Sequence, residues 1–393
     1  MNARMKWYSG GLWVSLALVA VPLLVGCGPT ATPTAGAVPP TATQMATAVL
    51  ATTTPITAAA TETPISPTSL PTATAVLEEK TPTSASTTVG GAQGAPQKAV
   101  LTLDWVPNTN HSGFYVALDK GWYKDEGLDL EIQIPSDPAA ALKQVAFGHT
   151  EFGVSFEEEV TIARAQKIPV VSIAAIIQHQ TSAFAALKGK GITRPKDFEG
   201  KKYASYGVPL ERPILKGLME CDGGDVNKVE FVDVGFDAFP ALVGGKVDLA
   251  WIFLAWDGVQ AEIMNKPLDT VPLAGSCVPD YYTPVIVSGE KTLAERPEIV
   301  RRFIAATAKG YRYAVEHPDE AAEILIKHSP ETLPDLVRRS QKWLSPRYQD
   351  DAPAWGVQKL QVWQEFGKWM ADRGLLAGPF KAEEAFTNDF LPK

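Results

Sequence analysis

Short apolar segments alternate with amphipathic segments from residue 99 onward, and this alternation limits the possible folds more than any other feature of the chain. Runs of four to eight apolar residues are typical of buried strands, and longer segments with a helical spacing of apolar residues are typical of helices. The predicted strands of the first set are 99–103, 128–134, 152–154 and 170–177, and the helices between them are 112–126, 139–147 and one that ends at Ala165. The alternation favours right-handed βαβ units in a mainly parallel sheet.

A second set of the same kind follows in the middle of the chain. Its strands are predicted at 203–206, 229–232 and 249–253, and its helices at 212–221 and 238–244. Two further strands, 183–187 and 284–288, bracket this set, and the chain after Thr292 is predicted to be almost wholly helical. We therefore expect an α/β protein of two lobes, with residues 98–187 and 284–393 in the first lobe and 188–283 in the second.

The loops that follow the predicted strands are the expected ligand site. Ligands of open α/β sheets bind outside the carboxyl ends of the strands, which brings 105–111, 155–159, 206–212 and 253–257 around one cleft. The first of these loops is rich in tryptophan, asparagine and histidine. Such side chains stack on a flat ring and satisfy its polar edge.

The first 26 residues have the pattern of a secretory signal peptide. Arg4 and Lys6 precede an apolar run, which is shorter than the roughly 20 residues that span a bilayer, and Cys27 follows. The residues around Cys27 resemble a bacterial lipobox, which implies that Cys27 is lipid-modified and anchors the protein to the cell membrane, facing the exterior or periplasm. The alternative is a signal peptide with an incidental cysteine.

Residues 27–97 are dominated by threonine, proline, alanine and serine. A segment of this composition buries too little apolar surface to offset its ordering entropy, so we expect a disordered tether between the anchor and the lobes.

Charge and cysteine content exclude some classes of function. The net charge is −8 and no basic stripe interrupts the acidic lobes, which argues against nucleic acid as a partner. Cys221 and Cys277 either pair in an oxidising exterior or are two buried thiols. The five histidines are dispersed and no Cys-x-x-Cys or glycine-rich phosphate loop is present, so no metal or cofactor is expected.

Four stretches carry a resemblance to a known family: LDWVPNTNHSGFYVALDKGWYKDEGLDLEI, FGVSFEEEVTIARAQKIPVVSIAAI, YGVPLERPIL and VDLAWIFLAWDGVQAE. Together they resemble the THI5/NMT1-like group within the SsuA/THI5 binding proteins. The resemblance implies the two-lobed periplasmic binding protein fold (type II). It also implies a monomer that captures a small molecule for an ABC permease and its ATPase. The lipobox, the tether and the aromatic loops are most similar to the riboflavin-binding RibY branch of lipoproteins, so riboflavin is the first choice of ligand.

Two alternatives stay open from the same resemblance. One is a receptor for a thiamine pyrimidine precursor of the hydroxymethylpyrimidine or formylaminopyrimidine type. The other is an enzyme that builds this pyrimidine from its own histidine and pyridoxal phosphate; His111 falls near the matching position, but the cysteine run of those enzymes is absent. An adhesion or sensory module is a third possibility, from another class. The export signal and the missing cysteines favour a binding protein without catalytic residues.

Eight side chains are the candidate ligand contacts, and several have a structural alternative. Asn108 and His111 suit a ring edge but equally suit a helix cap. The family pattern implies that Glu211 accepts from an exocyclic amine and that Trp256, rather than Trp251, contacts the ligand; Arg212 departs from the acidic or small residue expected there. Glu157 lies in an acidic run that a helix N-terminus also explains. The full set is Trp105, Asn108, His111, Glu157, Tyr206, Glu211, Trp256 and Tyr282.

Overall fold

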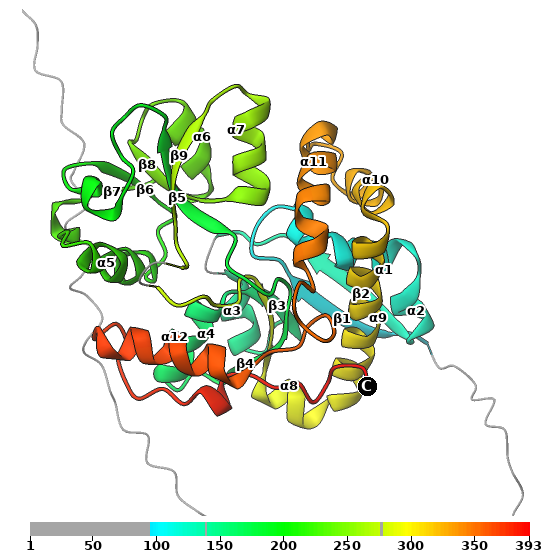
Figure 1. Cartoon of the computed structure of the whole chain (residues 1–393). Helices are drawn as coiled ribbons and strands as arrows, with labels where there is room; N and C mark the ends of the chain where they lie inside the picture. Colours follow the sequence, from blue (N-terminus) through cyan, green and yellow to red (C-terminus); the bar gives the residue numbers. More distant parts are fainter. Residues whose placement is uncertain (1–94, 138–139, 276–277) are drawn as a thin grey trace, which may run out of the picture. The chain divides into compact units, whose positions relative to one another are not determined.

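The computed structural model describes residues 95–137, 140–275 and 278–393 (Figure 1). The predicted signal peptide, Cys27 and the predicted tether up to residue 94 lie outside the described residues, and so does Cys277. Cys221 is exposed, and its sulfur accepts a hydrogen bond from Arg373 Nη2 at 3.5 Å.

Ten strands among the described residues form two separate five-stranded sheets. The order in the first sheet is β2-β1-β3-β10-β4, and in the second β7-β6-β8-β5-β9. The strands are β1 Gln97–Thr102, β2 Leu128–Gln133, β3 Phe152–Ser155, β4 Val170–Ala175, β5 Ser182–Leu187, β6 Lys202–Ser205, β7 Glu230–Asp233, β8 Leu249–Phe253, β9 Leu268–Pro272 and β10 Val285–Gly289.

Both sheets are mainly parallel, as expected, but each contains one reversed strand, β10 in the first sheet and β5 in the second. The β1–β2, β1–β3, β6–β7 and β6–β8 pairs are parallel, whereas β10 runs antiparallel to β3 and β4, and β5 antiparallel to β8 and β9. The antiparallel strands are the two that bracket the second set, because each enters its sheet from the other lobe. β5 therefore belongs to the second sheet, although residues 183–187 were assigned to the first lobe.

Twelve α-helices surround the sheets in the described part of the chain. They are α1 Ser112–Asp119, α2 Trp122–Asp125, α3 Ala140–Ala146, α4 Glu157–Ala165, α5 Glu211–Cys221, α6 Ala238–Val243, α7 Val259–Ile263, α8 Glu290–Glu295, α9 Pro297–Glu316, α10 Pro318–His328, α11 Pro334–Leu344 and α12 Leu360–Asp372. No helix among these described residues is long and apolar enough to cross a membrane.

Three local expectations are wrong. The helix expected over 112–126 is broken at Gly121, whose φ of 75° ends α1 and begins α2. The edge strand β9 was not expected, because its sequence LDTVP mixes polar residues and a proline, as edge strands do. The end of the chain is less helical than expected, since α12 ends at Asp372 and only the short turn Ala382–Glu384 follows.

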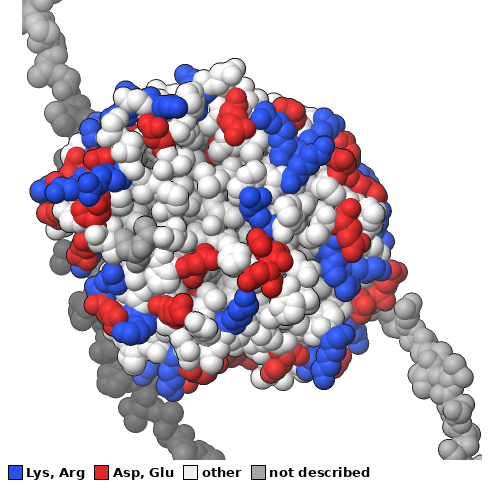
Figure 2. Space-filling view, viewed as in Figure 1, with Lys and Arg blue, Asp and Glu red and all other residues white. Residues whose placement is uncertain are grey.

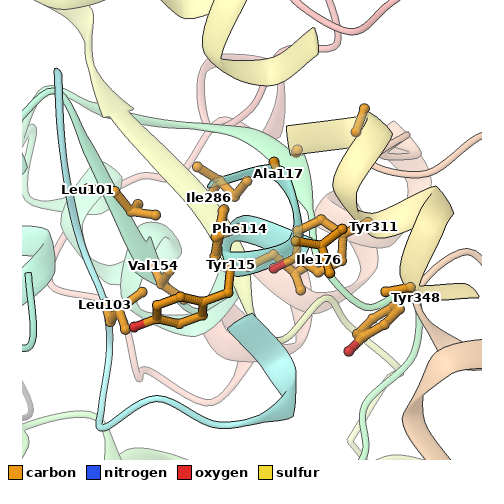
Figure 3. Close-up of a cluster of buried hydrophobic side chains, with 14 of the residues drawn as sticks. Leu101, Leu103, Phe114, Tyr115, Ala117, Val154, Ile176, Ile286, Tyr311 and Tyr348 are labelled. Carbon is orange, nitrogen blue, oxygen red and sulfur yellow. The ribbon is translucent and has the colours of Figure 1, made fainter. Parts of the chain in front are cut away.

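The core of the first lobe lies between its sheet and helices α1 and α9 (Figure 3). The rings of Phe152 on β3 and Phe303 on α9 stack with centroids 3.8 Å apart. Helices α1 and α9 cross at two glycines, where a Cβ on Gly310 would lie 2.0 Å from the Gly113 carbonyl oxygen. This close crossing fixes the start of α1 and the loop before it.

Helix α12 packs against both lobes, although the sequence assigned 284–393 to the first lobe. Trp363 is fully buried with Val145 and Val160 of the first lobe, whereas Phe366 stacks on Tyr281 with centroids 4.2 Å apart and belongs to the core of the second lobe. In Figure 1 this helix runs alongside α3 and α4. Helix α12 thus connects the two lobes, on the side where the chain crosses from one lobe to the other.

Candidate functional site

A cavity that opens to solvent lies between the two lobes and is the candidate functional site. All four loops that were expected around the cleft contribute to it. The lining residues are Asp104, Trp105, Asn108, Asn110, Phe156, Glu158, Glu159, Tyr206, Val208, Leu210, Glu211, Phe236, Trp251, Phe253 and Trp256.

The loop after β1 is held in place from beneath by buried polar contacts. His111 is fully buried; its Nε2 lies 2.6 Å from Asp104 Oδ1, and its Nδ1 accepts from the Asn108 backbone N–H at 3.3 Å. Tyr311 of α9 donates to the Asn110 carbonyl at 2.7 Å. His111 therefore orients Asp104 toward the cavity and does not reach the cavity itself.

Asn108 acts as a cap, one of the two roles that the sequence left open. Its Oδ1 accepts from the Asn110 N–H at 2.8 Å, and its Nδ2 donates to the Val106 carbonyl at 3.0 Å. These bonds begin the 3-10 turn Thr109–His111. The side chain lines the cavity while its polar atoms shape the loop.

Three consecutive glutamates begin α4 and point in different directions. Glu157 is fully buried and accepts from the Tyr282 N–H at 2.7 Å, in the second chain crossing between the lobes. Glu158 and Glu159 line the cavity; Glu158 Oε1 accepts from the Tyr281 hydroxyl at 3.4 Å, and Glu159 Oε2 accepts from Ser155 Oγ at 2.7 Å. The three glutamates do form the first turn of a helix, as the simpler sequence interpretation expected, but Glu157 and Glu158 are buried there.

Burial dominates the electrostatics of these carboxyls. It raises the pKa of Glu158 to about 8 and the pKa of Glu159 to about 7, with further raising contributions from the neighbouring charges of Glu159 and Asp104, respectively. Burial also raises the pKa of Glu157 well above its ordinary value. Removing charged groups from water disfavours their ionised form.

Glu211 organises the loop between β6 and α5. Its Oε1 accepts from Tyr203 Oη at 2.6 Å and the Tyr206 N–H at 2.9 Å, and its Oε2 accepts from Ser205 Oγ at 2.7 Å and the Val208 N–H at 3.3 Å. A carboxylate has about four acceptor positions, so these four donors fill them. Glu211 lines the cavity, but its oxygens are already engaged by the protein.

A π-helical turn, Leu254–Gly258, follows β8 and carries Trp256 into the cavity. Asp257 fixes the turn by accepting from the Phe253 N–H at 3.0 Å, and burial raises the pKa of Asp257 to about 7. Single π-helical turns occur frequently at functional sites. Trp251 is 5% exposed, as a core residue would be, yet it also lines the cavity and donates from Nε1 to Ser182 Oγ at 2.7 Å.

Aromatic rings from the two lobes face each other across the cavity. Trp105 of the first lobe and Phe236 of the second have centroids 6.2 Å apart, and Phe156 and Phe253 form a similar pair at 6.4 Å. Tyr206 adds a half-buried ring, whose hydroxyl donates to the Trp251 carbonyl at 2.9 Å. The site therefore offers apolar ring faces from both sides to a flat ligand.

The cavity is acidic. Asp104, Glu158, Glu159 and Glu211 line it, and none of the described lining residues is a lysine, an arginine or a histidine. Arg212, next to Glu211, is exposed, and its guanidinium lies over the Phe231 ring at 4.1 Å instead. No group of residues suited to hold a metal ion occurs in the described parts of the chain. On the face in Figure 2, by contrast, charges of both signs are interspersed.

The structure brings together five of the eight predicted contacts at the cavity: Trp105, Asn108, Tyr206, Glu211 and Trp256. His111 and Glu157 lie behind it, and Tyr282 is 1% exposed, with its hydroxyl accepting from the Lys359 N–H at 2.9 Å. These three residues support the loop and the chain crossing and do not line the cavity. Asp104, Glu158, Phe156, Phe236 and Phe253 line it without having been predicted individually.

A family model matches the chain. The model described as NMT1/THI5 like matches residues 108–321, which is more than half of the chain.

Several curated proteins are similar in sequence over most of their length. The "Formylaminopyrimidine-binding protein" of Halalkalibacterium halodurans is 29% identical over 317 residues, which cover 78% of this chain and 94% of that protein. The "Riboflavin-binding protein RibY" of Chloroflexus aurantiacus is 25% identical and covers 77% and 88%. The "4-amino-5-hydroxymethyl-2-methylpyrimidine phosphate synthase" of Legionella pneumophila is 26% identical and covers 75% and 92%.

Solved structures share the fold at low sequence identity. The ligand-binding component of an ABC-type import system from Staphylococcus aureus has a TM-score of 0.58 at 13% identity, and covers 75% of this chain and 97% of that one. The alkanesulfonate-binding protein SsuA from Xanthomonas axonopodis pv. citri has a TM-score of 0.57 at 14% identity and covers 76% and 99%. The described lobes thus have the two-lobed periplasmic binding protein fold.

Proposed function

The chain belongs to the NMT1/THI5-like family, and on this premise we propose that it is the substrate-binding component of an ABC importer whose ligand is a small, flat, amine-bearing heteroaromatic molecule. The observation that carries the proposal is the combination of aromatic faces from both lobes with four carboxyl groups and no basic side chain in the lining described. Aromatic faces bind a flat ring, and carboxyl oxygens accept hydrogen bonds from it.

An aminopyrimidine of the thiamine precursor type matches this lining best. Its exocyclic amine donates hydrogen bonds, whereas the polar edge of the isoalloxazine ring of riboflavin consists mostly of acceptors with a single N–H. The acidic lining contains many acceptors, so it pairs with a ligand that donates. Because Arg212 does not line the cavity, it no longer counts against a pyrimidine. The similarity to a formylaminopyrimidine-binding protein supports the same choice.

Riboflavin stays as the second candidate, because two features favour it. The cavity contains six aromatic residues besides Tyr206, namely Trp105, Phe156, Phe236, Trp251, Phe253 and Trp256, which is a large ring surface for one pyrimidine. The chain is also similar to RibY over most of its length.

A binding protein is a better proposal than a pyrimidine-synthesising enzyme. His111 is fully buried and both of its ring nitrogens are engaged, so it is poorly placed to be consumed in a reaction. Pyridoxal phosphate forms a Schiff base with a lysine, and no lysine is among the lining residues described. These residues are better suited to hold a ligand than to hold that cofactor.

Capture would work by closure of the lobes on the ring, with the protein acting as a monomer. Closed binding proteins of this architecture present one surface to a permease, and a lipid at Cys27 would keep the protein near it. Metabolic labelling with palmitate tests the anchor: the label should be lost in Cys27→Ser, and label that persists in Cys27→Ser would refute this part of the proposal.

Tryptophan fluorescence titration tests the function. The protein is titrated separately with an aminomethyl-substituted aminopyrimidine and with riboflavin. We expect saturable quenching by the pyrimidine at micromolar concentration or below, reduced in Trp256→Phe and retained in Trp122→Phe, because Trp122 lies on α2 and contacts Tyr313, away from the cavity. Quenching by riboflavin alone would move the protein to flavin uptake, and no response to either ligand would refute the proposal.

A further inference from the structure

The Glu158 side chain lines the cavity, but its carboxyl group accepts few hydrogen bonds from the protein. Glu158 is 2% exposed, and its Oε2 has no hydrogen-bond partner among the described residues. Its Oε1 accepts a long bond from the Tyr281 hydroxyl at 3.4 Å. A buried polar atom without a partner is costly. Oε2 is therefore a buried acceptor without a partner on a residue that lines the cavity, and a rotation of the side chain would present it to a ligand.

The other carboxyl groups of this region differ in how many hydrogen bonds they accept from the protein. Glu211 accepts four hydrogen bonds, and Glu157 is turned into the chain crossing. Within the described part of the chain, the side chain of Asp104 has His111 as its one hydrogen-bonding partner, and that of Glu159 has Ser155. Glu158, Asp104 and Glu159 thus form an acidic group on the first-lobe side of the cavity with acceptor capacity left over.

We infer that the cleft binds its ligand as an organic cation, a flat aromatic amine that carries a proton on its ring, and that the Glu158 carboxylate accepts the N–H of this cation. The inference rests on the proposed function and defines its ligand class more narrowly. A cation compensates the carboxylates, which no basic side chain of the described lining does. The facing aromatic rings add cation–π attraction.

The protonation state of Glu158 couples to this binding step. Burial raises its pKa to about 8, so the ligand-free protein holds a proton there near neutral pH. The titratable groups that act on it are Tyr281, Glu159 and the adjacent Glu157, none of which carries a positive charge. A ligand that is already cationic would displace the proton into solvent. A neutral pyrimidine would instead take that proton on its ring nitrogen, which leaves no net release.

A series of ligands with the same shape and different basicity tests the inference. It consists of an aminopyrimidine, the matching aminopyridine, which is cationic at neutral pH, and the matching aniline, whose ring has no nitrogen. Isothermal titration at pH 7 should rank their affinities as aminopyridine, then aminopyrimidine, then aniline. The affinity ratio between the aminopyridine and the aniline should fall by about tenfold to a hundredfold in Glu158→Gln, the range for a hydrogen bond to a charged group.

A matched control separates this role from an effect on lobe closure. Glu157→Gln makes the same chemical change in a neighbouring buried carboxyl that does not line the cavity. This substitution should leave the affinity ratio between the aminopyridine and the aniline unchanged, even if it changes the affinity for each of them. Titrations in buffers of different ionisation enthalpy should show proton release for the aminopyridine and none for the aniline.

The outcomes distinguish the inference from the proposed function. Equal affinities for the aminopyridine and the aniline, or a ratio that survives Glu158→Gln, would overturn the inference and leave the proposed function intact. Failure of the whole series to bind, with riboflavin also inactive, would overturn both.

Discussion

Replacing Glu211 should lower the free energy of unfolding of the ligand-free protein more than it lowers the affinity for the ligand. In Glu211→Gln one carboxylate oxygen becomes an NH₂ group, and the amide can orient either way. Tyr203 Oη or Ser205 Oγ can turn to accept from that NH₂, but the backbone N–H of Tyr206 or Val208 cannot. One buried N–H is therefore left facing a donor, which costs about 1–3 kcal/mol. Glu211→Ala removes the acceptor of all four donors and should cost about 4 kcal/mol or more.

Urea unfolding, followed by circular dichroism, measures this loss in the ligand-free protein. A control on the same helix is Glu220→Gln, because Glu220 is exposed and forms only a surface pair with Lys216 at 3.6 Å. Surface pairs contribute about 0–1 kcal/mol, so this control should stay near wild-type stability. The reasoning is refuted if Glu211→Gln unfolds at the wild-type midpoint while its ligand affinity collapses, because Glu211 would then act as a ligand acceptor.

Three further predictions follow from the cleft and its carboxyls. Trp105→Ala should weaken ligand binding by up to about tenfold in a calorimetric titration, since ring stacking contributes about 0.5–1.5 kcal/mol beyond buried area; unchanged affinity would show that Trp105 does not stack on the ligand. Arg339 of α11 and Glu262 of α7 form a 2.9 Å pair between the lobes, so Arg339→Glu should lower affinity by about two- to fivefold, and adding Glu262→Arg should restore it. The ligand-free protein should lose thermal stability between about pH 4 and 7: Asp257 has a folded pKa raised from 3.8 to about 7, so its contribution is fully present below the unfolded pKa and is lost as pH rises to the folded pKa. Asp257→Asn should make that loss shallower, and a stability that rises throughout this pH range would contradict it.

The order of strands along the chain and their mainly parallel direction were predictable, but the reversal of β5 and β10 was not. Buried runs such as Val170–Ala175, all six residues of which are buried, have an unmistakable apolar pattern. The antiparallel placement of β5 and β10 depends on the route of the chain between lobes, which leaves no local pattern. The same holds for α12, whose two faces pack on different lobes.

The site loops were predictable because they directly follow strands, whereas individual side chains within them were not. Glu157, Glu158 and Glu159 are consecutive in a helix, so their side chains point about 100° apart, and only the docking of α4 decides which of them faces the cavity. Phe236 lies in the short turn Gly235–Asp237, and only tertiary structure brings it opposite Trp105. His111 was predicted as a ligand contact, whereas it lies behind the cavity and contacts Asp104 there.

A crystal structure of the protein with a bound aminopyrimidine tests the central claim most directly. The account predicts a ring enclosed between aromatic side chains of the two lobes, with an N–H about 3 Å from Glu158 Oε2. A ligand bound outside this cavity, or one inside it that directs its amine away from the carboxyl groups, would contradict the account.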